Sequence, residues 1–139
     1  MTEPLSPLQR LEYMGFRRVG EWRLEEDSVK FALAEQADAR NILYAFVSGG
    51  DLVYIGKTVQ QLRRRIYGYQ CPGPTQSTNI KGNGLIKAAL VGSKGVEIYA
   101  LPDNGLLYYG GFHVNLAAGL EDALVAKLKP AWNRAGVDA

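Results

Sequence analysis

The sequence contains a single cysteine, Cys71, and a single histidine, His113. One cysteine excludes an internal disulfide framework, and one cysteine with one histidine is too few for the usual zinc sites. Any metal ion that the chain binds must therefore be held mainly by oxygen ligands. The histidine stands in a stretch rich in glycine and tyrosine, where we expect a structural role rather than a catalytic one.

Long apolar runs are also missing, because no run approaches the ~18 residues that span a bilayer. Two prolines and an acidic residue precede the first apolar run, which is unlike a secretory signal or a transit peptide. We therefore expect a cytoplasmic protein that has no membrane partner. The 139 residues suit one compact domain, and the 47% hydrophobic and 22% charged residues are typical of a globular protein.

Acidic residues are absent from the middle of the chain. Residues 52–96 contain no aspartate or glutamate, although the net charge of the whole chain is only +2. The bases of this segment are Lys57, Arg63, Arg64, Arg65, Lys81, Lys87 and Lys94. If these side chains share a face, their positive potential would suit a phosphate backbone, and the alternative is a solvated face without a partner.

The order of apolar and turn residues predicts alternating hairpins and helices. A capping box of Ser6 and Gln9 favours a short N-terminal helix. The expected elements are a helix from residue 7 to about 15, strands at 17–24 and 29–33, strands at 42–47 and 52–55, helices from Thr58 to about residue 68 and over 82–91, a strand at 96–101, and a helix from about Asn115 to before Pro130. Residues 71–79 and 102–114 are expected to form loops.

Five residues in this order resemble a known motif set. Tyr44 ends the segment Ile-Leu-Tyr, and Tyr54 begins Tyr-Ile-Gly-Lys-Thr. Arg65 lies on the expected helix that follows, Glu121 lies on the last helix, and Asn133 follows it. The pattern resembles the GIY-YIG nuclease superfamily, a set of single-metal phosphodiesterases, over about residues 42–133.

Two departures from the superfamily pattern stand out. The first motif begins with Ile-Leu rather than Gly-Ile, although its tyrosine is present. Eleven residues separate Tyr54 from Arg65, one more than in many members, so Arg64 remains an alternative for the arginine of the site.

The resemblance implies a small α/β (α+β) fold, in which a three-stranded antiparallel sheet is flanked by helices. Residues 42–139 would form this nuclease-like domain, and residues 1–41 would form a helix and hairpin extension packed on it. The implied activity is hydrolysis of phosphodiester bonds of DNA, with Mg²⁺ or Mn²⁺ as the cofactor.

The resemblance also implies roles for the metal-binding and phosphate-binding residues. Glu121 would bind the divalent ion, and Asn133 would orient Glu121 or the hairpin. Arg65, together with Lys57, would complement the charge of the phosphate.

The tyrosines would handle the attacking water. Tyr44 would orient or deprotonate it, Tyr69 could share that task, and Tyr54 would position the water or the phosphate. A tyrosine has an unperturbed pKa of ~10, so Arg65 or the metal would have to lower the pKa of Tyr44. The expected contacts with nucleic acid are Lys57, Arg63, Arg64, Thr78, Asn79 and Lys81.

Glu121 suggests a site independently of the family pattern. On a helix its neighbours three and four residues away are Ala117, Ala118, Leu124 and Val125, so it cannot form an ion pair within the helix. A hard cation is one candidate partner. The alternatives are water at the edge of the apolar stripe or a distant arginine.

The hairpin geometry decides whether Tyr44 and Tyr54 can share a site. With a two-residue loop at Gly49-Gly50 they would point to opposite faces of the sheet. A three-residue loop or a bulge would bring them to one face, and a shared site predicts this second arrangement.

A rival interpretation is a non-catalytic nucleic-acid-binding domain on the same scaffold. Such a domain could lose Glu121 without cost, whereas a nuclease could not. The oligomeric state and the structure of the nucleic-acid substrate are left open by the sequence.

Overall fold

The computed structural model describes residues 4–133. Its elements in chain order are α1 (Pro7–Met14), β1 (Arg17–Glu25), β2 (Ser28–Leu33), β3 (Ile42–Ser48), β4 (Asp51–Thr58), α2 (Leu62–Gln70), α3 (Ser77–Val91), β5 (Val96–Pro102), β6 (Tyr108–Tyr109), β7 (Phe112–His113) and α4 (Leu116–Leu128). The predicted α+β class is confirmed.

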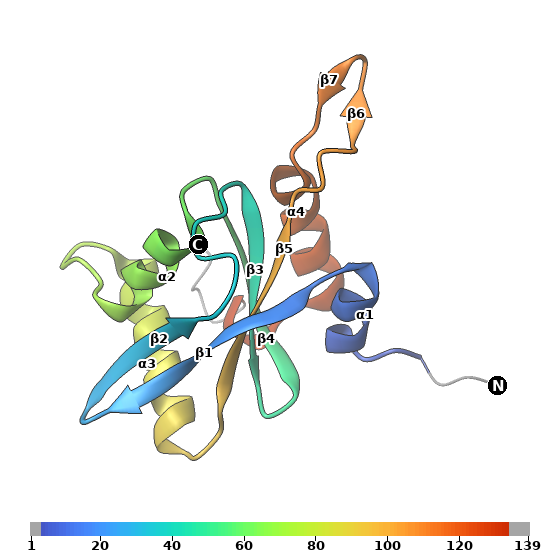
Figure 1. Ribbon diagram of the computed structural model, residues 1–139. Helices are drawn as coiled ribbons and strands as arrows, with labels where there is room; N and C mark the ends of the chain where they lie inside the picture. Colours follow the sequence, from blue (N-terminus) through green and yellow to red (C-terminus); the bar gives the residue numbers. More distant parts are fainter. Residues whose placement is uncertain (1–3, 134–139) are drawn as a thin grey trace.

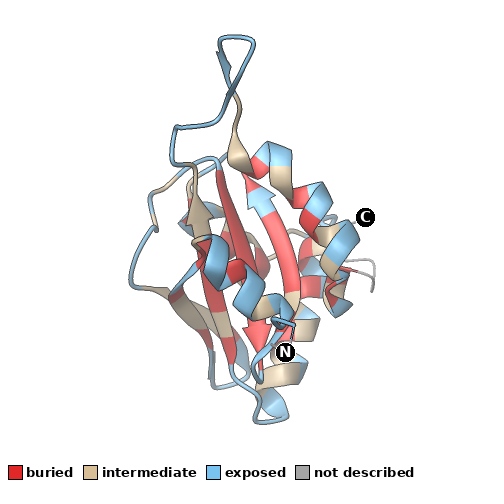
Figure 2. Ribbon diagram, turned by 90° about the vertical axis from the view of Figure 1, so that its right-hand side faces the viewer, coloured by how far each residue is buried: buried red, intermediate tan, exposed pale blue. Residues whose placement is uncertain are grey.

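Five strands form one antiparallel sheet in the order β2-β1-β5-β3-β4. Helices α2 and α3 cover one face, and α1 and α4 cover the other (Figure 1). All seven residues of β3 are buried because helices cover both faces of this inner strand, as Figure 2 shows in red.

The expected three-stranded sheet is wrong in its strand number. The N-terminal hairpin β1-β2 continues the same sheet, because β1 pairs with the free side of β5. Val19, Trp22 and Val29 then join the core on the side of α2 and α3. The apolar pattern predicted both strands of this hairpin, but a pattern within a strand does not reveal which strand it pairs with.

Two predicted helix starts and one predicted loop also differ. Residue Thr58 does not start a helix: it pairs with Ile42 at the end of β4, and α2 begins four residues later. Helix α3 begins at Ser77 instead of residue 82, so the preceding loop is shorter than expected. The loop over 102–114 contains the small ribbon of β6 and β7.

Other local predictions are confirmed. Ser6 and Gln9 form the capping box of α1. Asn115 caps α4 by accepting hydrogen bonds from two backbone N–H groups of the first turn, and α4 ends before Pro130.

A β-bulge sets the register of the β3-β4 hairpin. Gly49 and Gly50 both have positive φ, 61° and 83°, as a two-residue type I′ turn requires. The pairing shifts by one residue at Val53, so Phe46 pairs with Tyr54. Both Tyr44 and Tyr54 consequently join the core under α2 and α3, as the shared-site argument predicted.

The outer edge of β4 is closed by one side chain from beyond α4. Asn133 accepts a hydrogen bond from the Ile55 N–H at 3.0 Å and donates one to the Ile55 carbonyl at 3.0 Å. An edge strand leaves such groups unpaired, and the carboxamide replaces the missing neighbour strand at this residue. Within residues 4–133, no helix is long and apolar enough to cross a membrane.

We expect Asn133→Ala to lower the free energy of unfolding by about 2 kcal/mol or more, because it leaves the buried Ile55 N–H and carbonyl without their partner. Urea unfolding followed by circular dichroism measures the change. Replacement of the exposed Asp122 by Ala is the control and should stay within about 0.5 kcal/mol of the parent. Equal stability of the two variants would contradict the closing role of Asn133.

Candidate active site

Three tyrosine hydroxyls meet between the hairpin and α2. Tyr44 comes from β3, Tyr54 from β4 and Tyr69 from α2. The hydroxyl oxygens of Tyr44 and Tyr69 are 2.8 Å apart, and those of Tyr69 and Tyr54 are 3.2 Å apart. The ring centroids of the three tyrosines are 6.1 to 6.3 Å apart, so the rings form a triangle.

Hydrogen-bond counting fixes the direction of the protons in this cluster. The Tyr69 hydroxyl has one proton, which it donates to Tyr54, and it accepts a hydrogen bond from the guanidinium of Arg65 at 2.7 Å. Tyr44 must then be the donor in its contact with Tyr69. The Tyr69 oxygen is therefore the centre of the cluster, with two donors directed at it.

Arg65 is the arginine that contacts the tyrosines. Its Cζ atom lies 4.3 Å from the centroid of the Tyr69 ring, a cation–π geometry, while a second guanidinium nitrogen donates to the Asn79 side chain at 2.8 Å. Arg64, the alternative left open by the spacing, is exposed and points away from the cluster.

Two glycines make room for the rings. A Cβ atom on Gly56 would lie 2.5 Å from the Tyr44 ring and hydroxyl, because Gly56 pairs directly with Tyr44. A Cβ atom on Gly82 would lie 2.6 Å from the Tyr69 ring. The hairpin and α3 therefore approach the cluster as closely as they do only because both positions lack a side chain.

Helix α3 supplies a supporting layer that sequence reasoning missed. Asn79 was expected to contact nucleic acid from a flexible loop, but it is buried on α3 and holds Arg65, while its amide nitrogen donates to Gln76 at 3.0 Å. Asn83 donates to the Tyr69 carbonyl at 2.9 Å. Asn79, Gly82 and Asn83 are spaced by three and four residues, so helical periodicity was the signal for this face.

Burial determines the ionisation of the cluster. It raises the pKa of Tyr44, and the positive charge of Arg65 offsets only part of this effect. It also raises the pKa of Tyr69, as do the neighbouring Tyr44 and Tyr54 hydroxyls. Burial alone would lower the pKa of Arg65, but the tyrosine oxygens outweigh this effect and raise the pKa of the guanidinium. Arg65 alone therefore does not bring the pKa of Tyr44 below its ordinary value, so without a metal ion Tyr44 and Tyr69 are uncharged at neutral pH and Arg65 is charged.

Glu121 lies on the other side of the sheet from the tyrosines. It is buried on the face of α4 that carries Ala117 and Leu124, which pack in the core formed with α1. No group of three or more histidine, cysteine or acidic side chains is placed to hold a metal ion within residues 4–133. A carboxylate supplies the oxygen ligands that Mg²⁺ prefers. This ion commonly takes one or two protein carboxylates and completes its coordination shell with water and phosphate oxygens.

Lys57 lies on the same side of β4 as Glu121. Its backbone pairs with Leu43, a residue of the core under α4, and its side chain is exposed. It lines a hollow of about 400 Å³ with Thr58, Asn115 and Ala117, between the end of β4 and the start of α4. The predicted site residues thus form two groups on the two faces of β4.

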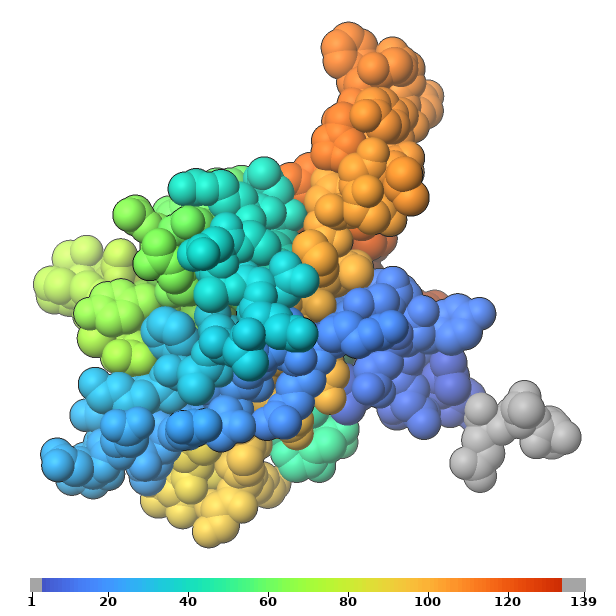
Figure 3. Space-filling view, in the orientation of Figure 1, coloured from blue at the N-terminus to red at the C-terminus, as the bar shows by residue number. Residues whose placement is uncertain are grey.

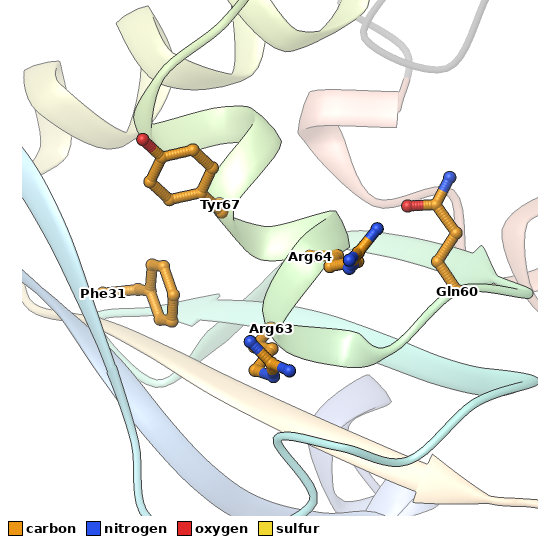
Figure 4. Close-up of a pocket in the computed structure, with 5 residues that line it drawn as sticks. All are labelled: Phe31, Gln60, Arg63, Arg64 and Tyr67. Carbon is orange, nitrogen blue, oxygen red and sulfur yellow. The ribbon is translucent and has the colours of Figure 1, made fainter.

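The remaining predicted nucleic-acid contacts are spread over α2 and α3. Arg63 and Arg64 are exposed on the outer side of α2, where they line an open hollow of about 430 Å³ with Gln60 and two aromatic rings (Figure 4). Arg63 also forms an ion pair with Asp38 at 2.8 Å. On α3, Lys81 is exposed and Thr78 is half-buried.

Two solved structures of endonucleases share this fold. A mutant of bacteriophage T4 EndoII superposes with a TM-score of 0.70 and 25% sequence identity, covering 94% of this chain and 99% of that chain. Restriction endonuclease HPY188I in complex with product DNA superposes with a TM-score of 0.53 and 15% identity, covering 90% of this chain and 80% of that chain. No protein-family model and no curated protein sequence matches the chain. The fold is therefore a nuclease fold.

Removal of the central hydroxyl tests the tyrosine cluster. We expect Tyr69→Phe to destabilise the fold by about 1 to 3 kcal/mol, since Arg65, Tyr44 and Tyr54 lose a buried partner. Tyr67→Phe removes a hydroxyl from an exposed ring on the same helix and should change stability little. Urea unfolding measures both, and an equal effect of the two substitutions would refute the central role of Tyr69.

Stability should fall as the pH rises above about 10. The unfolded chain releases the protons of Tyr44 and Tyr69 near this pH, whereas the folded chain retains them because their pKa values are raised. The folded state then binds more protons, so each tyrosine removes about 1.4 kcal/mol of stability per pH unit. Urea unfolding between about pH 9 and pH 11 measures the slope. It should be shallower in Tyr69→Phe, and an unchanged slope would contradict the assignment.

Proposed function

We propose that the chain is a divalent-metal-dependent endonuclease of the GIY-YIG type that hydrolyses phosphodiester bonds of DNA. The observation that carries the proposal is the guanidinium of Arg65, held against three tyrosine hydroxyls at the corner of a hairpin and a helix. The likeness to T4 EndoII over nearly the whole length of both chains supports it. The product DNA bound to restriction endonuclease HPY188I supports DNA as the substrate.

Arg65 would bind the scissile phosphate. Its charge is secured by the tyrosine oxygens, and its orientation is fixed by Asn79 and Tyr69 before substrate arrives. A guanidinium that is already oriented spends no free energy on reorganisation when charge develops on the phosphate oxygens. The side chain is half-buried, so part of it remains accessible to a phosphate.

The tyrosines would position water rather than remove its proton. Tyr44 is uncharged at neutral pH and donates its proton to Tyr69, which leaves its oxygen lone pairs as hydrogen-bond acceptors. Accepting a hydrogen bond from water orients the water without needing a phenolate. Tyr54, which accepts a hydrogen bond from Tyr69, would hold the water or the phosphate.

The end of β4 is the place where both groups of residues would reach one phosphate. Tyr44 lies opposite Gly56, Lys57 follows on the other face, and Thr58 borders the hollow at the start of α4. A phosphate at this strand end would have Arg65 on one side and Lys57 on the other. This is the position that we propose for the scissile phosphate.

Glu121 would hold the divalent ion on the α4 side, and the ion would stabilise charge on the phosphate and the leaving oxygen. Asn133 lies on the same edge of β4, where its side chain fixes the backbone of Ile55. It would act as a positioning residue by keeping β4 in place between the two groups.

A non-catalytic DNA-binding domain is the second candidate. It is favoured by the burial of the tyrosines, which are 1%, 3% and 0% exposed for Tyr44, Tyr54 and Tyr69. Such a buried and hydrogen-bonded cluster also stabilises a scaffold without any reaction. The two candidates differ in their need for Glu121.

Nicking of supercoiled plasmid with Mg²⁺ or Mn²⁺ separates the two functions. We expect the parent to nick, and Glu121→Gln to reduce the rate by about a hundredfold or more, because ion coordination supplies several kcal/mol to the transition state. Asp122→Asn, which alters the adjacent and exposed carboxylate, is the matched control and should cleave like the parent.

Added EDTA should abolish nicking by the parent and by Asp122→Asn. Equal retention of DNA by parent and Glu121→Gln in a gel-shift assay, with no nicking by either, would instead establish the binding domain.

A further inference from the structure

The β6-β7 ribbon concentrates exposed apolar side chains on a projecting arm. Between β5 and α4 the chain rises clear of the body and returns, at the top of Figures 1 to 3. Its exposed large apolar residues are Leu106, Leu107, Tyr108, Tyr109 and Phe112. Tyr109 is 84% exposed and Phe112 is 78% exposed. Apolar side chains gathered in this way mark an interaction surface.

The base of the arm is braced against α4. The Asp103 carboxylate lies 3.1 Å from Nε2 of His113 and accepts a hydrogen bond from the Gly105 N–H at 2.8 Å. It also accepts one from the Leu116 N–H at 3.4 Å, in the first turn of the helix that carries Glu121. These bonds lower the pKa of Asp103, chiefly the one from Gly105. These contacts hold the base of the arm against the start of α4, beside the candidate active site.

The arm itself carries no charge, whereas its surroundings are basic. No lysine, arginine, aspartate or glutamate occurs over residues 104–112. The root of the arm at Pro102 pairs with Ile42, which pairs in turn with Thr58, so the arm leaves the sheet where β3 begins and β4 ends. The exposed basic side chains near this end are those of Arg40, Lys57, Arg63 and Arg64. Of these, Arg63 is paired with Asp38.

We propose that this arm is a wedge that inserts aromatic side chains between bases of DNA near the cleaved phosphate. Apolar side chains can enter a base step, unstack it and kink the duplex. The flanking basic side chains supply the attraction to phosphates that residues 104–112 lack, and the carboxylate at the base of the arm, Asp103, is engaged by His113 and by backbone N–H groups. Pairing two arms from two copies of the chain would bring the two basic ends together, so charge favours DNA as the occupant.

This inference rests on the proposed function for its DNA partner but not on cleavage. The test uses the full chain in EDTA and a DNA duplex containing 2-aminopurine, whose fluorescence rises when it is unstacked. We expect fluorescence to rise when the parent binds, at one or two neighbouring positions of the probe. The combined variant Tyr109→Ser and Phe112→Ser should lose this rise and bind at least about fivefold more weakly, the loss expected for one stacked base.

Two matched variants separate the rings from general effects. Tyr13→Ser with Val91→Ser removes exposed apolar side chains from α1 and α3, and it should behave like the parent. Tyr109→Phe keeps the ring and should keep the fluorescence rise. Because Tyr109 and Phe112 are exposed, unfolding curves of all variants should match that of the parent.

Three results would overturn the wedge. One is binding of duplex by the parent without any fluorescence rise. Another is unchanged DNA affinity of the serine variant, with sedimentation showing that the parent forms dimers and the variant does not, which would make a second copy the occupant. The third is arm-dependent binding to phosphatidylserine vesicles with no arm-dependent binding to DNA. Plasmid nicking by the parent is scored separately, so the wedge and the nuclease can fail independently.

Discussion

The Tyr69 hydroxyl is the interaction on which the rest of the candidate site depends. It joins a strand, its hairpin partner and the guanidinium of Arg65 in one buried group. The cost of burying four polar side chains is offset because their hydrogen bonds are made to one another. Closure of the group also requires α3 to approach without a side chain at Gly82. The Tyr69 hydroxyl thus links the sheet to α2, and Asn79 links Arg65 to α3.

The edge strand β4 has a second organising role, because it separates two different chemical environments. On one face lie uncharged hydroxyls and a permanent cation in a buried, weakly screened setting. On the other face lie a buried carboxylate on α4 and an exposed lysine. Arg65 and Glu121, which carry opposite charges, therefore lie on different sides of this strand.

Local features of this protein could be predicted from sequence, whereas their assembly could not. The requirement that Tyr44 and Tyr54 share a face predicted the irregular hairpin, and the bulge at Val53 supplies it. Pairing of β1 with β5 was missed because strand partners are chosen by edges that no local pattern reveals. The start of α3 was missed because Thr78 and Asn79 favour loops by propensity, whereas contacts with α2 favour a helix.

The two hydrogen bonds between the Asn133 side chain and the Ile55 backbone, here called the Asn133 clasp, connect residues 78 positions apart. During synthesis on a ribosome, β3, β4 and α2 emerge long before residue 133 does. Until then the backbone groups of Ile55 at the outer edge of β4 have no protein partner from this clasp, and open strand edges are where nascent chains associate wrongly. This part of the β4 edge therefore stays open until almost the whole described chain has been translated.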